Sequence, residues 1–396
     1  MKSLNFYIKD SIEKHYSLGA YNFVNMEMLK GICKGCQKSK SPCITAVSEG
    51  AFDYMGENFV MAIFESAKKE YNDIPFFLHL DHGKSFEMCK KAVDLSFSSV
   101  MIDGSSLPFE ENIALTKKVV DYAHKKNVLV EAELGVLAGI EDYVHADKNV
   151  FTDPQKAKEF VERTNCDSLA VAIGTSHGAY KFKGESTLRF DILSEIEKEL
   201  PHFPLVLHGA SSVPQNYVKL INEFGGKVEG AKGVDEKLLF TASTKHNIFK
   251  INTDTDLRLV YTATIRKYLT ENPLNIDLRK FNLKAIDEIA NYVSNKNINV
   301  FNNANKIYGK YMNDSKANIS KINDVSHDGH RERLTNLINN VGLENVSKIQ
   351  AVEYFLTYIF PRGDVNPLAH RLLDRFENFG NIVDASENDL KTINGI

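Results

Sequence analysis

Few cysteines and no long apolar run are present, and these absences limit the class of protein. The chain has 396 residues and five cysteines, an odd and sparse set that argues against a disulfide framework and favours a reducing compartment. No run approaches the roughly 20 apolar residues that a membrane-spanning helix needs, and the N-terminus has no apolar segment of signal-peptide length. We therefore expect a cytoplasmic protein without a membrane partner.

Excess positive charge and the common nucleotide-binding motifs are also missing. The net charge is −4, with 43% hydrophobic and 25% charged residues, which is typical of a globular protein and gives no sign of a nucleic-acid surface. The first strand candidate, residues 20–24, is not followed by the glycine-rich turn of a doubly wound dinucleotide-binding sheet. Gly83-Lys84-Ser85 lacks the upstream glycine of a P-loop, so ATP binding is not expected.

Short apolar or β-branched runs alternate with helical segments as far as about residue 306. Between them lie amphipathic stretches such as residues 109–126, with apolar residues at helical spacing. Eight strand–helix units in roughly 300 residues match the size of a (β/α)₈ TIM barrel, which is the predicted fold. The strand candidates are residues 20–24, 44–50, 76–82, 99–104, 128–135, 168–174, 204–210 and 248–254.

Polar side chains gather at the ends of these strand candidates. The C-terminal ends of the strands carry the active site in barrel enzymes, so the coincidence predicts a functional rim. One further residue, His177, follows the end of its strand by three positions. The rim residues are Asn22, Ser48, Asp81, His82, Asp103, Glu133, His208, Asn252 and Asp254.

Three histidines on this rim predict a metal site. His82, His177 and His208 lie at or just past the ends of three different strand candidates, and three imidazoles leave a fourth position of a zinc ion open for catalysis. Zinc held in this way polarises a carbonyl oxygen and stabilises a neighbouring enolate. Asp81, beside His82, is then the expected proton carrier.

Two further acids and a long loop lie close by in the sequence. Asp103 and Glu133 end the fourth and fifth strands, where they are expected either to hold a second cation or to orient the histidines through hydrogen bonds. The loop after the fifth strand carries Glu141. Long loops over a barrel mouth often close on substrate and bring in a catalytic group.

Anion-binding features follow the last strands. Lys181 lies in a glycine- and hydroxyl-rich segment, and Ser211 follows a strand in a similar segment. Asn252, Thr255 and Arg258 follow the eighth strand. Barrel phosphate sites typically use these loops, where backbone N–H groups point at the anion.

Residues 1–307 resemble the class II, metal-dependent fructose-bisphosphate aldolases. The HLDH and GTSHG forms are similar to the branch that also includes tagatose-bisphosphate aldolases. The motifs that carry the resemblance occur in the family's order and are YNFVNMEML, VSEGA, LHLDHG, SVMIDGS, EAELG, GIED, GTSHGAYKF, VLHGASSVP and NTDTDLR.

The resemblance implies a role for each matching residue. His82, His177 and His208 would ligate the catalytic Zn²⁺. Asp81 would take the proton from the C4 hydroxyl during cleavage, and Glu141 would exchange the proton at the enediolate carbon. Asp103 and Glu133 match positions that can hold a second divalent metal.

The resemblance also implies a sugar bisphosphate substrate bound at both ends. Ser48, Asp277 and Arg279 match positions at its far end, some of them reaching in from a partner subunit, so a homodimer or homotetramer is expected. A monovalent cation, Na⁺ or K⁺, often belongs to the phosphate pocket. The residues expected around dihydroxyacetone phosphate are Gly178, Lys181, Gly209, Ser211, Asn252, Asp254 and Thr255, with Asn22 and Arg258 also expected to bind substrate.

The composition changes after Asn305. Residues 308–326 are polar and are expected to form a linker, followed by a small all-α segment at 327–396. This segment resembles the N-terminal helical domain of RadC-type proteins, in the strings GHRERL, FPRGDVNPLAHRLLDRF and LKTINGI, and the sequence stops inside the family's helix-hairpin-helix. It holds seven Lys or Arg against ten Asp or Glu, so strong nucleic-acid binding is not expected.

Three alternatives remain open at this stage. The same chemistry on tagatose 1,6-bisphosphate differs only in the configuration of one hydroxyl, although Asp277-Leu278-Arg279 favours fructose. A Schiff-base aldolase is less consistent with three converging histidines, although Lys250 shares strand parity with Asn252 and is able to face inward. A nucleic-acid-associated protein acting through the C-terminal segment is the alternative of a different class.

Overall fold

The computed structural model contains two compact units, Met1–Lys310 and Tyr311–Ile396. It describes residues 2–136, 139–141, 144–146, 150–175, 187–308, 338, 348–359, 365–376 and 379–393. The linker expected at residues 308–326 lies almost entirely outside this part of the chain. The division into barrel, linker and helical segment therefore stays a prediction.

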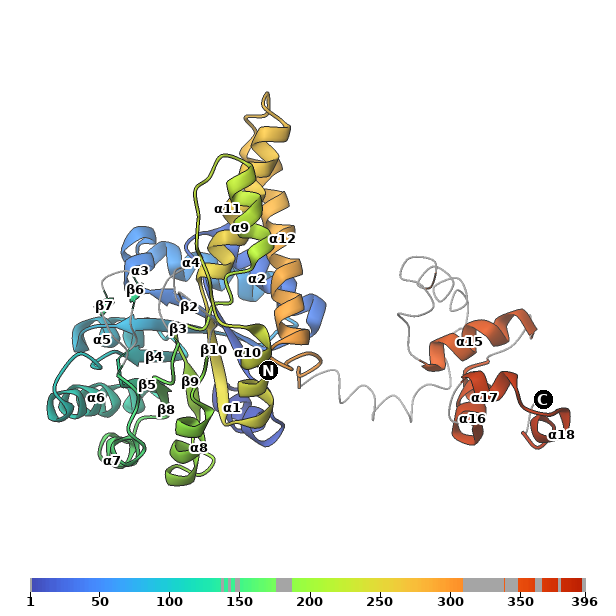
Figure 1. Cartoon of the computed structure of the whole chain (residues 1–396), viewed down its shortest axis with the longest axis horizontal. Helices are drawn as coiled ribbons and strands as arrows, with labels where there is room; N and C mark the ends of the chain where they lie inside the picture. The colour runs from blue at the N-terminus through green and yellow to red at the C-terminus, as the bar shows by residue number, and fades with distance from the viewer. Residues whose placement is uncertain are drawn as a thin grey trace. The chain divides into compact units, whose positions relative to one another are not determined.

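The first unit is a closed barrel of eight parallel strands (Figure 1). Each strand pairs with its neighbours in parallel register, and β1 closes the ring against β10. The predicted TIM barrel is confirmed, with strand bounds within a few residues of those expected. The barrel strands are β1 (Leu18–Asn22), β2 (Cys43–Ser48), β3 (Phe76–Gly83), β4 (Ser99–Ile102), β5 (Leu129–Leu134), β8 (Ser168–Val171), β9 (Leu205–Leu207) and β10 (Ile248–Thr253).

Burial on both faces explains the apolar character of the strands. Every residue of β1, β2, β3 and β10 is buried, as parallel strands covered by helices on one side and packed inside the barrel on the other must be. The outer faces pack on the surrounding helices in one large apolar cluster. Polar groups inside the barrel are therefore exceptional and mark the site.

Helices surround the strands, and several of them start at a polar capping residue. Ser85 and Asp153, for example, accept hydrogen bonds from the first backbone N–H groups of their helices, which satisfies donors that the helix itself leaves open. The helices of this unit are α1 (Leu4–Glu13), α2 (Met26–Ser39), α3 (Glu49–Met55), α4 (Glu57–Glu70), α5 (Phe86–Asp94), α6 (Phe109–Ala123), the 3₁₀ turn η1 (His124–Lys126), α7 (Pro154–Thr164), α8 (Phe190–Glu199), α9 (Gln215–Glu223), α10 (Glu236–Lys245), α11 (Thr255–Glu271) and α12 (Leu278–Asn299).

The long loop after β5 contains a hairpin that the sequence patterns did not predict. Strands β6 (Gly139–Glu141) and β7 (Val144–Ala146) pair in antiparallel register, with Glu141 opposite Val144. A further bridge joins Val136 to Val150 at the base of the loop. The loop therefore leaves and rejoins the barrel at adjacent points, close to the end of β5.

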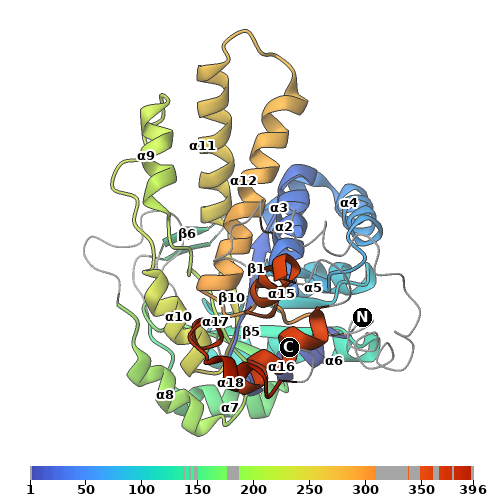
Figure 2. The same ribbon diagram turned by 90° about the vertical axis from the view of Figure 1, so that its right-hand side faces the viewer.

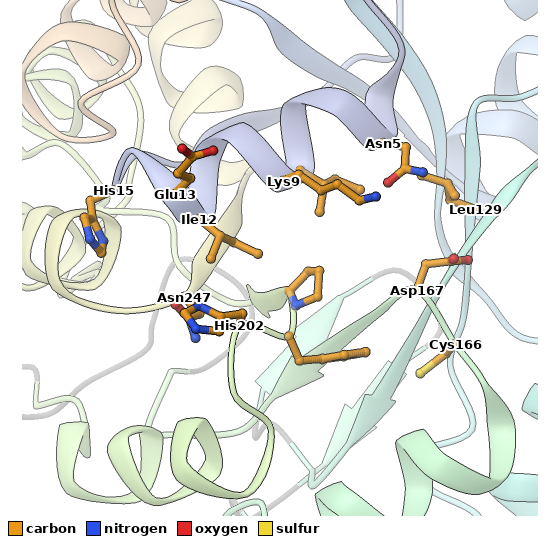
Figure 3. A pocket seen from close by; sticks show the side chains of 13 residues that line it. Asn5, Lys9, Ile12, Glu13, His15, Leu129, Cys166, Asp167, His202 and Asn247 are labelled. Carbon is orange, nitrogen blue, oxygen red and sulfur yellow. The ribbon is translucent and has the colours of Figure 1, made fainter.

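Helix α1 closes the N-terminal end of the barrel. Leu4, Tyr7 and Ile8 of α1 belong to one buried cluster with inward-facing strand residues such as Ile44 and Phe77. A cavity of about 680 Å³ lies beside α1, lined by residues at the starts of β5, β8 and β9 (Figure 3). It therefore lies at the opposite end of the barrel from the polar rim.

Helices α11 and α12 form a long antiparallel hairpin that extends beyond the barrel beside α9 (Figure 2). The turn that joins them carries Leu274 and Ile276, which are 96% and 92% exposed. At the base of the hairpin, α12 packs along α2. The hairpin thus combines a buried base with an apolar, exposed tip.

The second unit consists of short helices around a small apolar core. Val352 and Leu356 of one helix pack with Leu368 and Leu372 of the next. The described helices are α15 (Lys348–Ile359), α16 (Asn366–Phe376), α17 (Phe379–Val383) and α18 (Glu387–Leu390). Among the described residues of both units, no helix has the length and apolar character that crossing a bilayer requires.

Candidate metal and active site

The end of β3 departs from regular strand geometry where Asp81 and His82 lie. The pairing with β4 shifts register between Leu80 and Gly83, and His82 has a φ of 49°, which is uncommon for a residue other than glycine. In a regular strand, neighbouring side chains leave on opposite faces. The bulge and the left-handed residue instead bring both side chains to the same place at the barrel mouth.

Two histidine rings meet at this place. His82 Nε2 lies 2.8 Å from His208 Nδ1, and the rings are edge to face. Asp81 Oδ1 lies 3.9 Å from the same His208 nitrogen. These three buried residues, contributed by β3 and the loop after β9, form a group whose ligand atoms are close enough to share one metal ion.

The hydrogen bonds on the far sides of the two rings assign their tautomers. His82 Nδ1 lies 3.1 Å from Asp103 Oδ2, and His208 Nε2 lies 2.7 Å from Glu131 Oε1. A carboxylate only accepts, so both of these ring nitrogens are donors. The lone pairs of His82 Nε2 and His208 Nδ1 therefore face each other, a repulsive contact that a bound cation relieves. Carboxylates that orient metal-binding histidines are the usual arrangement, so these residues fit a zinc ion.

Asp81 is held by two amides, which come from β1 and β10. Asn22 Nδ2 donates to Asp81 Oδ2 at 2.8 Å, and Asn252 Nδ2 donates to Asp81 Oδ1 at 2.9 Å. All three side chains are buried. The Oδ1 atoms of both asparagines have no hydrogen-bond partner among the described residues. Since buried polar atoms are rarely left unpaired, these two acceptors fit hydroxyl groups of a ligand.

A charged network inside the barrel supports His208 and was not predicted from the sequence. Lys250 Nζ donates to both carboxylate oxygens of Glu131, at 2.7 and 2.8 Å, and lies 3.1 Å from His79 Nε2. His79 Nδ1 in turn contacts Ser99 Oγ at 2.8 Å. Lys250 faces inward, as its strand parity allowed, but its ammonium group is occupied by an ion pair and does not take the role of a Schiff-base lysine.

Burial and charge act in opposite directions on these groups. Burial alone would raise the pKa of Glu131, but the charge of Lys250 and the hydrogen bond from His208 hold that pKa well below its usual range. Burial lowers the pKa of His208, and burial together with the charge of Lys250 lowers the pKa of His79 to about 3. Both imidazoles are thus neutral at pH 7, and for His208 this is the form that binds metal.

Asp103 and Glu133 both approach His82. Asp103 Oδ2 accepts from His82 Nδ1, and Asp103 Oδ1 accepts from Ser105 Oγ at 2.7 Å. Glu133 Oε2 lies 3.8 Å from the same His82 nitrogen. Burial would raise the pKa of Asp103, but the hydrogen bonds from His82 and Ser105 hold it below its usual range. His82, Asp103 and Glu133 form a second group with metal-binding spacing.

The predicted phosphate loops lie at the same end of the barrel. Gly209, which directly follows His208, has a φ of 58°, and Ser211 is buried. Thr255 begins α11, whose first N–H groups favour an anion. Asp254 and Arg258 bond to each other through two contacts of 2.8 Å.

Ser48, Asp277 and Arg279 lie in different parts of the barrel unit. Ser48 ends β2 beside Asp81 in register, and its Oγ caps α3 through the N–H of Ala51. Asp277 caps the start of α12, after the turn that joins it to α11, and Arg279 forms a two-armed ion pair with it, with contacts of 3.0 Å. Ser48 therefore belongs to the strand ends, and Asp277 and Arg279 to the start of a helix.

Four predicted residues fall wholly or partly outside the described residues. His177, Gly178 and Lys181 lie between residues 176 and 186, which the structure does not describe. Of Glu141, only the backbone in β6 is described. Their predicted roles are left as predictions.

Comparison with known proteins agrees with this geometry. Residues 2–306 match the family model of class II fructose-bisphosphate aldolases. A fructose-bisphosphate aldolase of Treponema pallidum is 44% identical over 314 residues, which are 75% of this chain and 94% of that protein. One of Helicobacter pylori is 47% identical over 294 residues, which are 74% of this chain and 95% of the relative.

A solved structure extends the comparison to the fold. The YdjI aldolase from Escherichia coli K12 is 30% identical and superposes with a TM-score of 0.63, covering 77% of this chain and 99% of that one. The family model matches the barrel unit, which carries both groups of residues with metal-binding spacing. The chain therefore belongs to the class II fructose-bisphosphate aldolase family, whose members are lyases.

Proposed function

We propose that the barrel catalyses the reversible, zinc-dependent cleavage of fructose 1,6-bisphosphate into dihydroxyacetone phosphate and glyceraldehyde 3-phosphate. The observation that carries the proposal is the convergence of His82 Nε2 and His208 Nδ1, 2.8 Å apart, beside the buried carboxylate of Asp81. Relatives that the chain matches over 94% and 95% of their lengths are named fructose-bisphosphate aldolase.

His82 and His208 would hold zinc through the two nitrogens that face each other, and His177 would complete the set. When bound, the metal polarises the substrate carbonyl and stabilises the negative charge that develops beside it. Asp103 and Glu131 keep the two rings oriented through their distal nitrogens. A second divalent cation between Asp103 and Glu133 is a further part of the proposal, supported only by their spacing.

Asp81 moves the proton of the C4 hydroxyl. Its carboxylate is fixed by Asn22 and Asn252, so that it stays an acceptor aimed at one position rather than rotating freely. Taking the proton makes the C4 oxygen a carbonyl while the C3–C4 bond breaks, and its electrons pass to the enediolate. The unpaired Oδ1 atoms of the two asparagines are suited to accept hydrogen bonds from neighbouring substrate hydroxyls.

Glu141 would return a proton to the enediolate carbon, and this protonation would give dihydroxyacetone phosphate. The phosphate of this product would bind to Gly209, Ser211 and Thr255, with Asn252, Asp254 and Arg258 nearby. Gly178, Lys181 and a monovalent cation would complete that pocket. Neutral N–H donors and a helix start favour an anion here.

The far end of the bisphosphate would meet Ser48 of the same chain. Asp277 and Arg279 lie at the start of α12, and we propose that they serve the site of a neighbouring subunit in a homodimer or homotetramer. A cytoplasmic location, the RadC-like character of residues 327–396 and their weak affinity for nucleic acid remain predictions from the sequence.

A coupled assay tests the proposal. The full chain is assayed on fructose 1,6-bisphosphate and tagatose 1,6-bisphosphate, before and after chelator and after added Zn²⁺. We expect cleavage of the fructose substrate, its loss in chelator and its recovery with zinc, with His82→Ala inactive throughout. Full activity in excess chelator, with borohydride trapping of substrate on a lysine, would refute zinc catalysis, and a preference for tagatose would correct the substrate.

A further inference from the structure

The loop from Gly209 to Val213, which follows β9, adopts a backbone that its own residues disfavour. Val213 has a φ of 51° and Gly209 a φ of 58°. A β-branched residue in the left-handed region is a genuine outlier, and it persists only where the surrounding structure fixes it. The contacts that hold this loop therefore determine where its N–H groups point.

Asp256 supplies the main contacts. Its Oδ1 accepts from the backbone N–H of Val213 at 2.8 Å, and its Oδ2 accepts from the backbone N–H and the hydroxyl of Ser212, both at 3.1 Å. Tyr292 donates to the same Oδ2 at 2.7 Å. Asp256 is fully buried in the first turn of α11, so one carboxylate ties the loop after β9 to the helix after β10.

Lys296 balances this buried charge. Its Nζ lies 3.5 Å from Asp256 Oδ2, 3.0 Å from Ser212 Oγ and 3.1 Å from Glu236 Oε1. Lys296 comes from the far end of α12 and is only 1% exposed. Burial would raise the pKa of Asp256, but the charge of Lys296 and the hydrogen bonds keep it lowered, so both oxygens remain acceptors at neutral pH.

Gly233 confines the loop from the opposite side. A Cβ atom at this position would lie 2.4 Å from the carbonyl oxygen of Ser211 and 2.4 Å from the carbonyl carbon of Ser212. Real Cβ atoms do not approach backbone so closely. Any side chain at Gly233 would therefore push Ser211 and Ser212, and Ser212 is one of the two residues that Asp256 holds.

We propose that Asp256 is a positioning residue that presents the Gly209–Val213 backbone to the phosphate group of the substrate. This inference rests on the proposed function, because Gly209 and Ser211 are its phosphate contacts. An asparagine at position 256 has only one acceptor oxygen, so it satisfies one of the two backbone N–H groups and opposes the other with its own donor. The substitution would then weaken the contacts to the phosphate and leave the groups that act on the reacting atoms in place.

Asp256→Asn and Gly233→Ala test the proposal by independent routes. The first removes an acceptor, and the second displaces the loop without a change of charge. For each we expect the KM for fructose 1,6-bisphosphate and the dissociation constant of inorganic phosphate to rise about tenfold, the loss of roughly one charged hydrogen bond. We expect kcat to change much less, and amide exchange at Ser212 and Val213 to accelerate.

Tyr21→Phe is the matched control. It removes a buried 2.8 Å hydrogen bond to Asn297, the neighbour of Lys296 on α12, and should lower stability without moving KM or exchange in the loop. Unchanged KM and unchanged exchange in Asp256→Asn, or a loss confined to kcat, would overturn the proposal. If the unaltered chain cleaves neither bisphosphate, the proposed function fails, while phosphate binding and amide exchange still decide the role of Asp256.

Discussion

Replacement of Lys250 by methionine should weaken both the fold and the metal site. The Nζ of Lys250 bonds both oxygens of Glu131 at 2.7 and 2.8 Å, and the two residues are 1% and 2% exposed. Methionine keeps most of the side-chain volume but removes the charge. Among the described residues, the buried carboxylate of Glu131 would then keep the 2.7 Å hydrogen bond from His208 and a longer contact of 3.9 Å with His79 Nε2.

The size of the effect follows from this burial. Breaking a buried pair by removing one partner costs about 3–5 kcal/mol, because the remaining charge is left in a medium of low polarity. Since His208 still bonds Glu131, we expect the free energy of unfolding to fall by about 3 kcal/mol, the lower end of this range. Glu131 orients the ring whose Nδ1 faces the metal position, and loss of such support typically lowers metal affinity 10- to 100-fold.

Two measurements on the metal-free chain check the prediction. Urea unfolding followed by circular dichroism measures stability, and titration with Zn²⁺ against a chromophoric chelator measures affinity. The double variant Lys250→Met/Glu131→Gln removes both charges, so it should regain most of the stability. Its zinc affinity should stay below that of the unaltered chain, because a neutral amide polarises His208 less than a carboxylate does.

Stability within about 0.5 kcal/mol of the unaltered chain, together with unchanged zinc affinity, would refute the reasoning. That magnitude is typical of surface substitutions, and it would mean that Lys250 and Glu131 are not coupled in solution. A loss of stability without loss of zinc affinity would restrict the network to a structural role.

Three further predictions concern single parts of the barrel. Asp81→Ala should lower kcat by roughly 10²-fold or more, the scale of general acid–base catalysis, with normal zinc content; an unchanged kcat contradicts its role as proton carrier. The pKa of His79 is lowered to about 3, against about 6.5 in an unfolded chain. The unfolded chain therefore gains a proton first as pH falls below 6.5, and stability should decrease by about 1.4 kcal/mol per pH unit; His79→Gln should flatten this slope in urea unfolding. A chain ending at Lys310 keeps Tyr308, whose ring packs against Phe6, and should retain activity within a few-fold; a large loss of kcat would show that the second unit supports the site.

The sequence predicted the barrel because its signals are local. Each strand is a short run of apolar or β-branched residues between helical segments, and each run became a strand within a few residues of its expected bounds. The hairpin of β6 and β7 was missed because three-residue strands have too few residues to show periodicity. Its pairing depends on the closure of a long loop and not on the residues themselves.

Part of the candidate site could also be predicted from local sequence signals. His82, Asp81 and His208 were identified because each lies at or just past the C-terminal end of a strand, and parallel strands bring these ends to one rim. Glu131 was missed although it lies two residues before Glu133, on the same face of β5. A charged residue in a strand that is otherwise apolar indicates a buried ion pair. The partner of Glu131, Lys250, lies 119 residues away, so the sequence does not show which residue completes the pair.

The sequence by itself determined which residues reach the rim, because the end of a strand and the residues at that end can be recognised from a short stretch of sequence. Only the tertiary structure decided how those residues act on one another. The register shift in β3 and the left-handed backbone of His82 turn that ring toward His208, and the paired strands β1 and β10, neither of which pairs with β3, bring Asn22 and Asn252 to Asp81. Hydrogen bonds and ion pairs form only at about 3 Å. They therefore depend on the closed barrel, which brings together residues that are far apart in the sequence.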